Sequence, residues 1–414
     1  MMANIWADLG LTDNPYDPRP LSIDADDREL FVGRTETLDE FNTLLSTKGG
    51  MIIVEGKVGV GKTSFVNIGL YDKFELGRYL PCDKIDLEGN MCIIQFILSV
   101  FSNMFNSVEK CDKTGRLERF AIHKKAKTLL SQIIQSRGGD EVKFFGTGEE
   151  KSRQIYATSP VAVVLASIVS VMNEWINFVK NKLNYRAIIV PLDNLDIVDD
   201  VDIVTFLNKT RDTMMGFDGV WWILVGKPNL FSLLEGKSNR ISEMVTESPI
   251  KLGPLSKKEV HSMIKLRIKN LSVDKIKAPV PKRVIDILYD VSKGEARYIL
   301  NRCSDLVLKF HTKFPSEKIV PEEMAIKILS VMARERIDNA NISHSDREIL
   351  EKMTKKERFQ NKEYKHFGKP SAQNFNYLIK KLLSLGLIIR EESSGRDVYY
   401  HTAGDVNMVF GVKS

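Results

Sequence analysis

The chain has 414 residues, of which 43% are hydrophobic and 28% are charged. This composition excludes a disordered or fibrous protein, and the length predicts about two to four domains around large cores. The net charge is only +6, so the distribution of the charge matters more than its size. The four cysteines show no CxxC spacing, which argues against a metal site and against a disulfide framework.

The amino-terminal stretch MMANIWADLG lacks the basic and apolar regions of a secretion signal. The longest apolar run, residues 161–172, is too short to span a bilayer. We therefore expect a cytoplasmic protein with no membrane partner.

The strongest local signal is MIIVEGKVGVGKTSF at residues 51–65. Its first four residues are typical of a buried parallel strand, and the pattern GxxxxGKT follows at the expected strand-to-helix turn. Such a loop surrounds a phosphate with backbone N–H groups at the positive end of a helix. We expect Lys62 to contact the β- and γ-phosphates of ATP and the Thr63 hydroxyl to bind Mg²⁺. The nucleotide-binding candidates of this loop are Gly56, Gly59, Val60, Gly61, Lys62, Thr63 and Ser64.

A second strand is expected at residues 84–87, followed by an insertion at about residues 108–160. Within it, the sequence pattern predicts an amphipathic helix at 117–134 and then a polar loop or hairpin that contains several glycines. Long insertions of this kind are elaborations of a fold or contact surfaces for partners.

The stretch RAIIVPLDNLD at residues 186–196 predicts a strand that is buried on both faces and ends in Asp193. Asp193 suits a magnesium site shared with Thr63; alternatively, it caps the helix expected at 203–214. Asn194 stands where a glutamate would activate the attacking water, and an amide can bind that water but cannot accept its proton. We therefore expect slow turnover, with Asp196 as the nearest other carboxylate.

Taken in order, these motifs resemble the AAA+ ATPases, in particular the initiator group of origin-recognition and cell-division-control ATPases and related STAND-like switches. The resemblance covers about residues 13–335 and rests on FVGR (31–34), GKVGVGKT, IIVPLDNLD, Arg240, LGPLSKKEV and GEARYIL. It implies an α/β fold, a three-layer αβα P-loop core with a helical lid, and a nucleotide-dependent homo-oligomer that uses ATP and Mg²⁺.

The resemblance also implies roles for single residues outside the P-loop. Arg34 would lie near the adenine pocket, and Lys227 or Asn229 would sense the γ-phosphate at the end of a strand at 220–226. Arg240 would be an arginine finger for a neighbouring subunit, and Arg297 a second sensor near a helix start. For both of these arginines a solvated surface charge is the alternative.

The last 75 residues predict a helix in SHSDREILEKMT, a short helix at EYKHF, a long helix in SAQNFNYLIKKLLSLGLI and a hairpin turning at Ser394 and Gly395. This order is that of a winged helix. Residues 341–414 contain 13 Lys and Arg against nine Asp and Glu, which favours duplex DNA as a partner, with docking of a protein effector as the alternative. The candidate DNA contacts are Lys369, Ser371, Gln373, Asn374, Lys380, Lys381 and Arg396.

We therefore expect an N-terminal segment (1–30), an AAA+ core (31–253), a helical lid (254–338) and a winged helix (339–414). The function this organisation favours is an ATP-binding, slowly hydrolysing switch that couples nucleotide state and oligomerisation to DNA binding. The alternative is a signalling or anti-phage-defence type of ATPase whose winged helix docks a protein effector.

Overall fold

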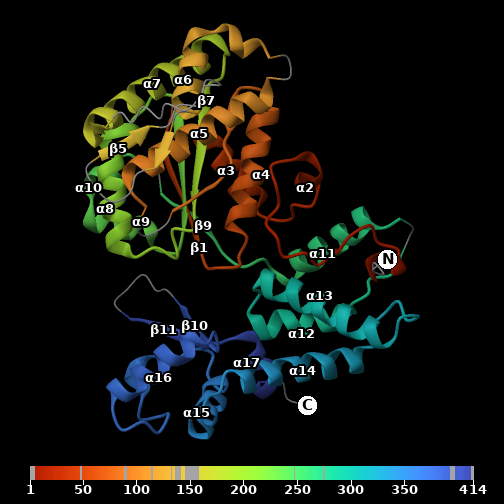
Figure 1. Ribbon diagram of the computed structural model, residues 1–414. Coiled ribbons are helices and arrows are strands. Elements are labelled where there is room, and N and C mark those ends of the chain that lie inside the picture. The colour runs from red at the N-terminus through yellow and green to blue at the C-terminus, as the bar shows by residue number, and fades with distance from the viewer. Residues whose placement is uncertain are drawn as a thin grey trace.

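A computed structural model describes residues 5–46, 49–87, 91–112, 115–131, 133–135, 141–144, 158–246, 248–273, 276–391 and 397–411 of the chain. Figure 1 shows an α/β core in the upper half of the molecule and helical elements below it. No helix in these ranges is long and apolar enough to cross a membrane.

The core is built on a parallel sheet with the strand order β2-β7-β8-β1-β9. Its strands are β1 (Gly50–Gly56), β2 (Tyr79–Pro81), β7 (Ala187–Asp193), β8 (Val220–Gly226) and β9 (Ile250–Leu252), and the short β3 (Ile85–Asp86) also pairs with β7. All of these pairings are parallel. The strands expected from apolar runs at β1, β3, β7 and β8 are present, whereas β2 was not predicted.

Helices cover both faces of this sheet. On one face lie α5 (Ile93–Cys111), α7 (Val161–Lys182) and α8 (Asp200–Thr210). On the other face lie α3 (Thr35–Leu44) and α4 (Lys62–Glu75). The predicted three-layer αβα core is therefore confirmed.

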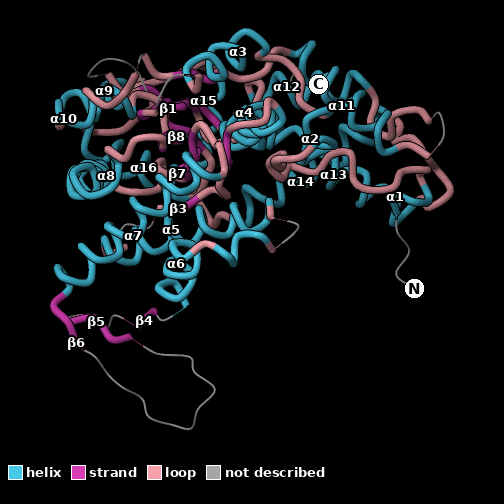
Figure 2. The backbone as a smooth tube through the Cα atoms, turned by 90° about the horizontal axis from the view of Figure 1, so that it is seen from above, coloured by secondary structure: helices cyan, strands magenta, loops and turns pink. Residues whose placement is uncertain are grey.

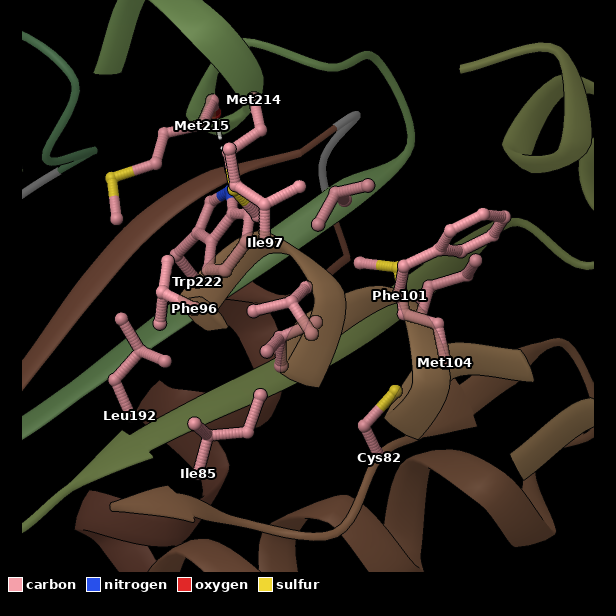
Figure 3. Close-up of a cluster of buried hydrophobic side chains, with 14 of the residues drawn as sticks. Cys82, Ile85, Phe96, Ile97, Phe101, Met104, Leu192, Met214, Met215 and Trp222 are labelled. Carbon is pink, nitrogen blue, oxygen red and sulfur yellow. Dashed lines mark hydrogen bonds between the residues drawn. The ribbon is translucent and has the colours of Figure 1, made fainter. Parts of the chain in front are cut away.

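Strand β7 shows why the sheet needs cover on both sides. Its seven residues are all buried; Ile188, Val190 and Leu192 face the α5 side, and Ala187 and Ile189 face the α4 side. In Figure 3, Phe96, Phe101 and Met104 of α5 lie against the strands that carry Leu192 and Trp222. Burying each large apolar side chain contributes about 1.5–3 kcal/mol, so this helix fixes the sheet from one side.

The insertion after α5 forms a 3₁₀ turn (Arg116–Arg119), α6 (Ala121–Ser131) and the small antiparallel sheet β4 (Ile133–Gln135), β5 (Glu141–Phe144) and β6 (Thr158–Pro160). Figure 2 shows this small sheet beyond the ends of α6 and α7, away from the core. The predicted amphipathic helix is shorter than expected, because it ends at Ser131. Most of the predicted polar loop, residues 137–140 and 145–157, lies outside the described residues.

Below the core, the lid consists of α11 (Lys257–Leu271), α12 (Lys282–Ser292), α13 (Ala296–Lys313) and α14 (Glu322–Asn339). Helix α11 begins with a capping box, since Ser256 and Glu259 exchange side-chain and backbone hydrogen bonds. The N-terminal segment, with α1 (Ile5–Asp8) and α2 (Ala25–Glu29), contributes Leu9, Leu11 and Tyr16 to the buried core of the lid.

The C-terminal elements are α15 (His344–Thr354), a 3₁₀ turn (Asn361–Glu363), α16 (Ala372–Ser384), the hairpin β10 (Ile388–Glu391) and β11 (Tyr399–Thr402), and α17 (Gly404–Phe410). The helix expected at EYKHF (363–367) is wrong, because the 3₁₀ turn ends at Glu363 and residues 364–368 form turns. Helix α17 was not predicted, and it packs on α12 and α14 of the lid. In Figure 1 the hairpin lies between the core and α16.

Candidate nucleotide-binding site

The P-loop connects β1 to α4 through two glycines in the left-handed region. Gly59 has a φ of 81° and Gly61 a φ of 92°, conformations that an L side chain rarely adopts. Helix α4 begins at Lys62, whose Nζ donates to the carbonyl oxygens of Gly56 at 2.8 Å and Lys57 at 3.2 Å. The lysine is thereby folded back under the loop, with only 8% of its side chain exposed.

The structure brings Thr63 and Asp193 together, although they come from different elements. The Thr63 Oγ1 donates to Asp193 Oδ2 at 2.7 Å, and Asp193 is buried at the end of β7. Helix α8 is preceded instead by Asp199 at its N-cap position, so the interpretation of Asp193 as a helix cap is wrong. A hydroxyl and a carboxylate are hard oxygen ligands, and the pair therefore fits Mg²⁺.

Asn194 and Asp196 do not continue the strand. Asn194 has a left-handed φ of 60°, and its backbone N–H donates to Asp193 Oδ1 at 2.8 Å. Its side-chain Nδ2 donates to Asp86 Oδ1 at 2.8 Å, a contact that no sequence motif indicated. Asp196 forms an ion pair with Lys62 at 3.3 Å.

A cavity opens between the core and the lid next to these residues. One end is polar and holds the P-loop with Asp193, Asn194 and Asp196. The rest is mostly apolar, which suits a purine base. The residues that line this part are Pro18, Arg19, Pro20, Leu21, Leu30, Phe31, Val32, Leu255, Met263, Arg267, Ala296 and Leu300.

Residues 18–21 form a wall of this cavity that sequence reasoning missed. The Ser64 hydroxyl accepts a hydrogen bond from Leu21 N at 3.0 Å, and Asn67 Nδ2 donates to Leu21 O at 2.7 Å. These two bonds attach the N-terminal segment to the first turns of α4. The stretch carries no motif, so only its folded position indicates a role.

Arg34 lines the cavity and also connects its two sides. Its Nη2 donates to Val60 O of the P-loop and to Gly253 O before the lid, each at 2.7 Å. Burial lowers the pKa of Arg34, and the Glu259 carboxylate opposes that shift. The structure thus gives Arg34 a bracing contact in addition to its position beside the pocket.

Arg297 and Arg240 occupy different places. Arg297 lies in the first turn of α13 and lines the cavity. Arg240 lies in the short helix α10 (Asn239–Ser242), outside the lining of the cavity, with 72% of its side chain exposed and a distant ion pair of 3.9 Å to Asp212.

The two candidate sensors at the end of β8 also lie outside the lining of this cavity. Asn229 occupies the N-cap position of α9 (Leu230–Lys237) with a φ of 65°. Lys227 pairs with Asp200 and lines a second cavity beside the P-loop, together with Asp196. Lys227 therefore shares a cavity with P-loop residues, whereas Asn229 lines neither cavity.

No family model matches the chain, and no curated protein matches it either. Solved structures do. The Aeropyrum pernix ORC2 protein in ADPNP and ADP complexes is 15% identical over 96% of this chain and 95% of that one, with a TM-score of 0.47. The Aeropyrum pernix ORC1 protein in complex with DNA is 13% identical over 92% of both chains, with a TM-score of 0.47. Cdc6p from Pyrobaculum aerophilum is 12% identical over 97% of both chains, with a TM-score of 0.42.

The solved structures that are similar to this chain thus include origin-recognition and cell-division-control proteins, the group that the sequence motifs resemble. Identities and TM-scores this low do not carry a function from one chain to another.

Some of the candidate DNA contacts in the C-terminal domain already have partners within the protein, and others are exposed. The Ser371 hydroxyl caps α16 by accepting from Asn374 N at 3.2 Å. Lys369 and Lys381 pair with Asp346 at 3.5 and 3.0 Å. Burial tends to raise the pKa of Asp346, but the hydrogen bond from Lys381 and its other partners lower it overall.

Gln373, Asn374 and Lys380 are exposed on α16. Tyr377, which is 76% exposed, lies on the same face, as its spacing from Gln373 and Lys380 along a helix requires. Sequence reasoning missed this tyrosine, although the spacing was visible. Arg396 lies outside the described residues.

Proposed function

We propose that this protein is an ATP-binding and slowly ATP-hydrolysing switch that controls the binding of duplex DNA by its C-terminal domain. The observation that carries the nucleotide part is the contact of Thr63 with Asp193 at 2.7 Å beside Lys62, in a cavity that Arg297 of the lid also lines. A hydroxyl, a carboxylate and a lysine at a glycine loop are the set that phosphoryl transfer requires.

The residues of the site have separate roles in this proposal. The loop amides and Lys62 hold the phosphates, and Arg297 adds a positive charge from the lid side. Thr63 and Asp193 would hold Mg²⁺, which supplies charge neutralisation at the phosphates when it is bound. Asn194 is an amide in the place of a base, so turnover is slow.

Lys62 must change partner when a nucleotide binds. Its Nζ is bonded to Gly56, Lys57 and Asp196, and a phosphate competes for the same ammonium group. Exchange of the Asp196 ion pair for a phosphate contact is the local event by which ATP alters the site.

Duplex DNA is the partner that the open face of α16 fits. Gln373, Asn374, Tyr377 and Lys380 offer amides, an aromatic ring and a positive charge on one helix face, the groups that reach base edges and phosphates in a groove. Lys352, Lys355 and Lys365 are exposed nearby in the sequence and would add attraction to phosphates.

The lysine of the P-loop gives the test of the nucleotide part. Lys62→Ala should abolish ATP binding, measured by equilibrium titration with a fluorescent ATP analogue. Lys209→Ala, which removes a lysine from α8 outside the cavity, is the matched control. Unchanged ATP affinity of Lys62→Ala would refute the site.

Charge reversal on α16 gives the test of the DNA part. Lys380→Glu combined with Tyr377→Ala should weaken binding of a labelled duplex and reduce its salt dependence. Lys327→Glu makes the same charge change on the exposed side of α14 and should bind as wild type does. Absence of duplex binding at low salt would exclude DNA as the partner and leave docking of a protein.

A further inference from the structure

The hydrogen bond between Asp86 and Asn194 joins the ends of two neighbouring strands. Asp86 ends β3 and lies opposite Asp193 in the parallel register with β7. Asn194 follows Asp193 directly, and its Nδ2 donates to Asp86 Oδ1 at 2.8 Å. The two side chains therefore meet at the edge of the sheet where the P-loop and the Thr63–Asp193 pair lie.

The chemistry of this bond fixes which way the amide of Asn194 points. An ionised carboxylate can only accept hydrogen bonds, so the NH₂ group of Asn194 must face Asp86 and its oxygen must face away. Asp86 also accepts hydrogen bonds from Lys84, whose Nζ donates to Oδ1 at 2.8 Å and Oδ2 at 3.1 Å. The backbone of Asn194 is fixed as well, through its N–H bond to Asp193 Oδ1.

The oxygen of this amide is available to a ligand of the cavity. Asn194 lines the cavity, and within the described residues no group donates a hydrogen bond to its Oδ1. Asp86 lies outside the lining. Of the two carboxylates that line the cavity, Asp193 accepts hydrogen bonds from the Thr63 hydroxyl and from Asn194 N. Asp196 pairs with Lys62 at 3.3 Å, and in the proposed function it loses that partner when a phosphate binds Lys62. Asn194 Oδ1 is thus an acceptor beside the end of β7 that lines the cavity and has no donor among the described residues.

We propose that Asp86 is a positioning residue for ATP hydrolysis: it orients Asn194 so that the amide oxygen accepts a hydrogen bond from the attacking water. This inference rests on the proposed function. In the reaction the water oxygen bonds to the γ-phosphorus, and the bond from that phosphorus to the bridging oxygen breaks with its electron pair left on ADP. The proton of the water passes to a phosphate oxygen, because an amide orients the water without accepting its proton.

Replacing Asp86 with asparagine tests this role. An asparagine can donate as well as accept, so Asn194 loses the constraint on its amide orientation. Asp86→Asn should lower the rate of ATP hydrolysis roughly 10- to 100-fold, the order expected when a reacting group is misplaced by about 1 Å. The affinity for ATP should stay as in wild type, while formation of a stable complex with ADP and aluminium fluoride, a mimic of the transferring phosphate, should be lost.

Asp83→Asn is the matched control, because Asp83 is an exposed aspartate three positions earlier that pairs with Lys110 instead. It should hydrolyse ATP and form the fluoride complex as wild type does. The side chain of Asp86 is 49% exposed, so both variants should fold, and equal melting temperatures would verify this.

A second pair of variants distinguishes orientation from a general need for a carboxylate. Asn194→Glu alone sets a carboxylate against Asp86, and repulsion should prevent a gain in rate. The double variant Asp86→Asn with Asn194→Glu removes the repulsion and should hydrolyse ATP faster than Asn194→Glu.

The outcomes separate this inference from the proposed function. The role of Asp86 is overturned if Asp86→Asn hydrolyses ATP at the wild-type rate, or if it loses ATP affinity to the same degree as activity. Neither result contradicts ATP binding by the wild-type protein. A wild-type protein that binds ATP but forms neither phosphate nor the fluoride complex also overturns it. A wild-type protein that binds no ATP overturns both.

Discussion

Replacing Asp405 with asparagine tests how the C-terminal domain is fixed to the lid. Asp405 lies in the first turn of α17, and its side chain is 4% exposed. It accepts hydrogen bonds from Arg302 Nη2 at 2.6 Å and Nε at 3.0 Å, and from Arg336 Nη1 at 2.9 Å. The hydroxyl of Tyr298 donates to it at 2.9 Å. One carboxylate therefore connects α17 to both α13 and α14.

The burial of the partners sets the size of the effect. Arg302 is only 14% exposed, and removing one partner of a buried ion pair costs about 3–5 kcal/mol, because the other charge stays buried without compensation. Arg336 is 50% exposed, so its share is that of a surface pair, about 0–1 kcal/mol. Arg302 also keeps Asp305 at 3.2 Å, a carboxylate that is 45% exposed. We therefore expect a loss of about 3 kcal/mol, at the lower end of that range.

Hydrogen exchange measures this loss where it should occur. In Asp405→Asn the free energy of opening of the α17 amides should fall by about 3 kcal/mol, while the amides of the core sheet keep their protection. Asp305→Asn is the control, since it removes the exposed partner of the same arginine and should cost less than about 1 kcal/mol. Equal effects of the two substitutions would refute the assignment of Asp405 as the main attachment.

Three further predictions concern other parts of the molecule. Burial and the Lys293 ammonium lower the pKa of His401. The neutral histidine therefore adds stability above its ordinary pKa of about 6.5, and this stability is lost as the pH falls through that value and below. Acidification from about pH 7.5 to about pH 5.5 should lower the melting temperature more in wild type than in His401→Gln, and equal shifts would contradict the assignment. Gly69→Ala would place a Cβ 2.5 Å from the ring of the buried Phe41 and should lower the free energy of unfolding by about 1–3 kcal/mol; a stabilised Gly69→Ala would show that Phe41 can move away. Gly236→Ala would place its Cβ more than 4 Å from every atom of the described residues apart from its chain neighbours and the local helix backbone, and it should raise the free energy of unfolding by about 0.5–1 kcal/mol. Arg240→Ala should abolish ATP-dependent assembly in light scattering without changing the ATP affinity of the monomer, and a loss of monomer affinity would place Arg240 in its own subunit's site.

The parts of the site that lie close together in the sequence were predictable. The P-loop residues 56–64 form one strand-turn-helix unit, and Asp193 ends a strand of seven buried residues, so local patterns indicate both. That Thr63 and Asp193 belong to one site follows from parallel strands whose carboxyl ends meet at one edge of a sheet.

Each of the remaining contacts includes a residue that belongs to no recognisable motif. Asp86 and Asn194 are 108 positions apart, and a two-residue strand such as β3 carries no periodicity that would specify which residues it faces. The same limit applies to Lys369 and Lys381, whose basic character predicted DNA contacts, whereas the fold pairs both with Asp346. Charge in a sequence identifies candidates, but the neighbours in space decide which charges stay open.

The contacts of the C-terminal domain with the P-loop and with the lid differ in strength, and this difference predicts how the proposed switch moves. Glu391 of β10 reaches Lys57 of the P-loop at 3.9 Å and Lys293 of the lid at 3.8 Å, long contacts of partly exposed groups that contribute about 0–1 kcal/mol each. Removing Asp405 from its buried cluster with the lid costs about 3 kcal/mol, several times as much. We therefore expect the C-terminal domain to follow the lid when a nucleotide binds, so that the weak contact between β10 and the P-loop is the one that changes. Because α16 packs on β10, its open face would then change position relative to the core together with the lid.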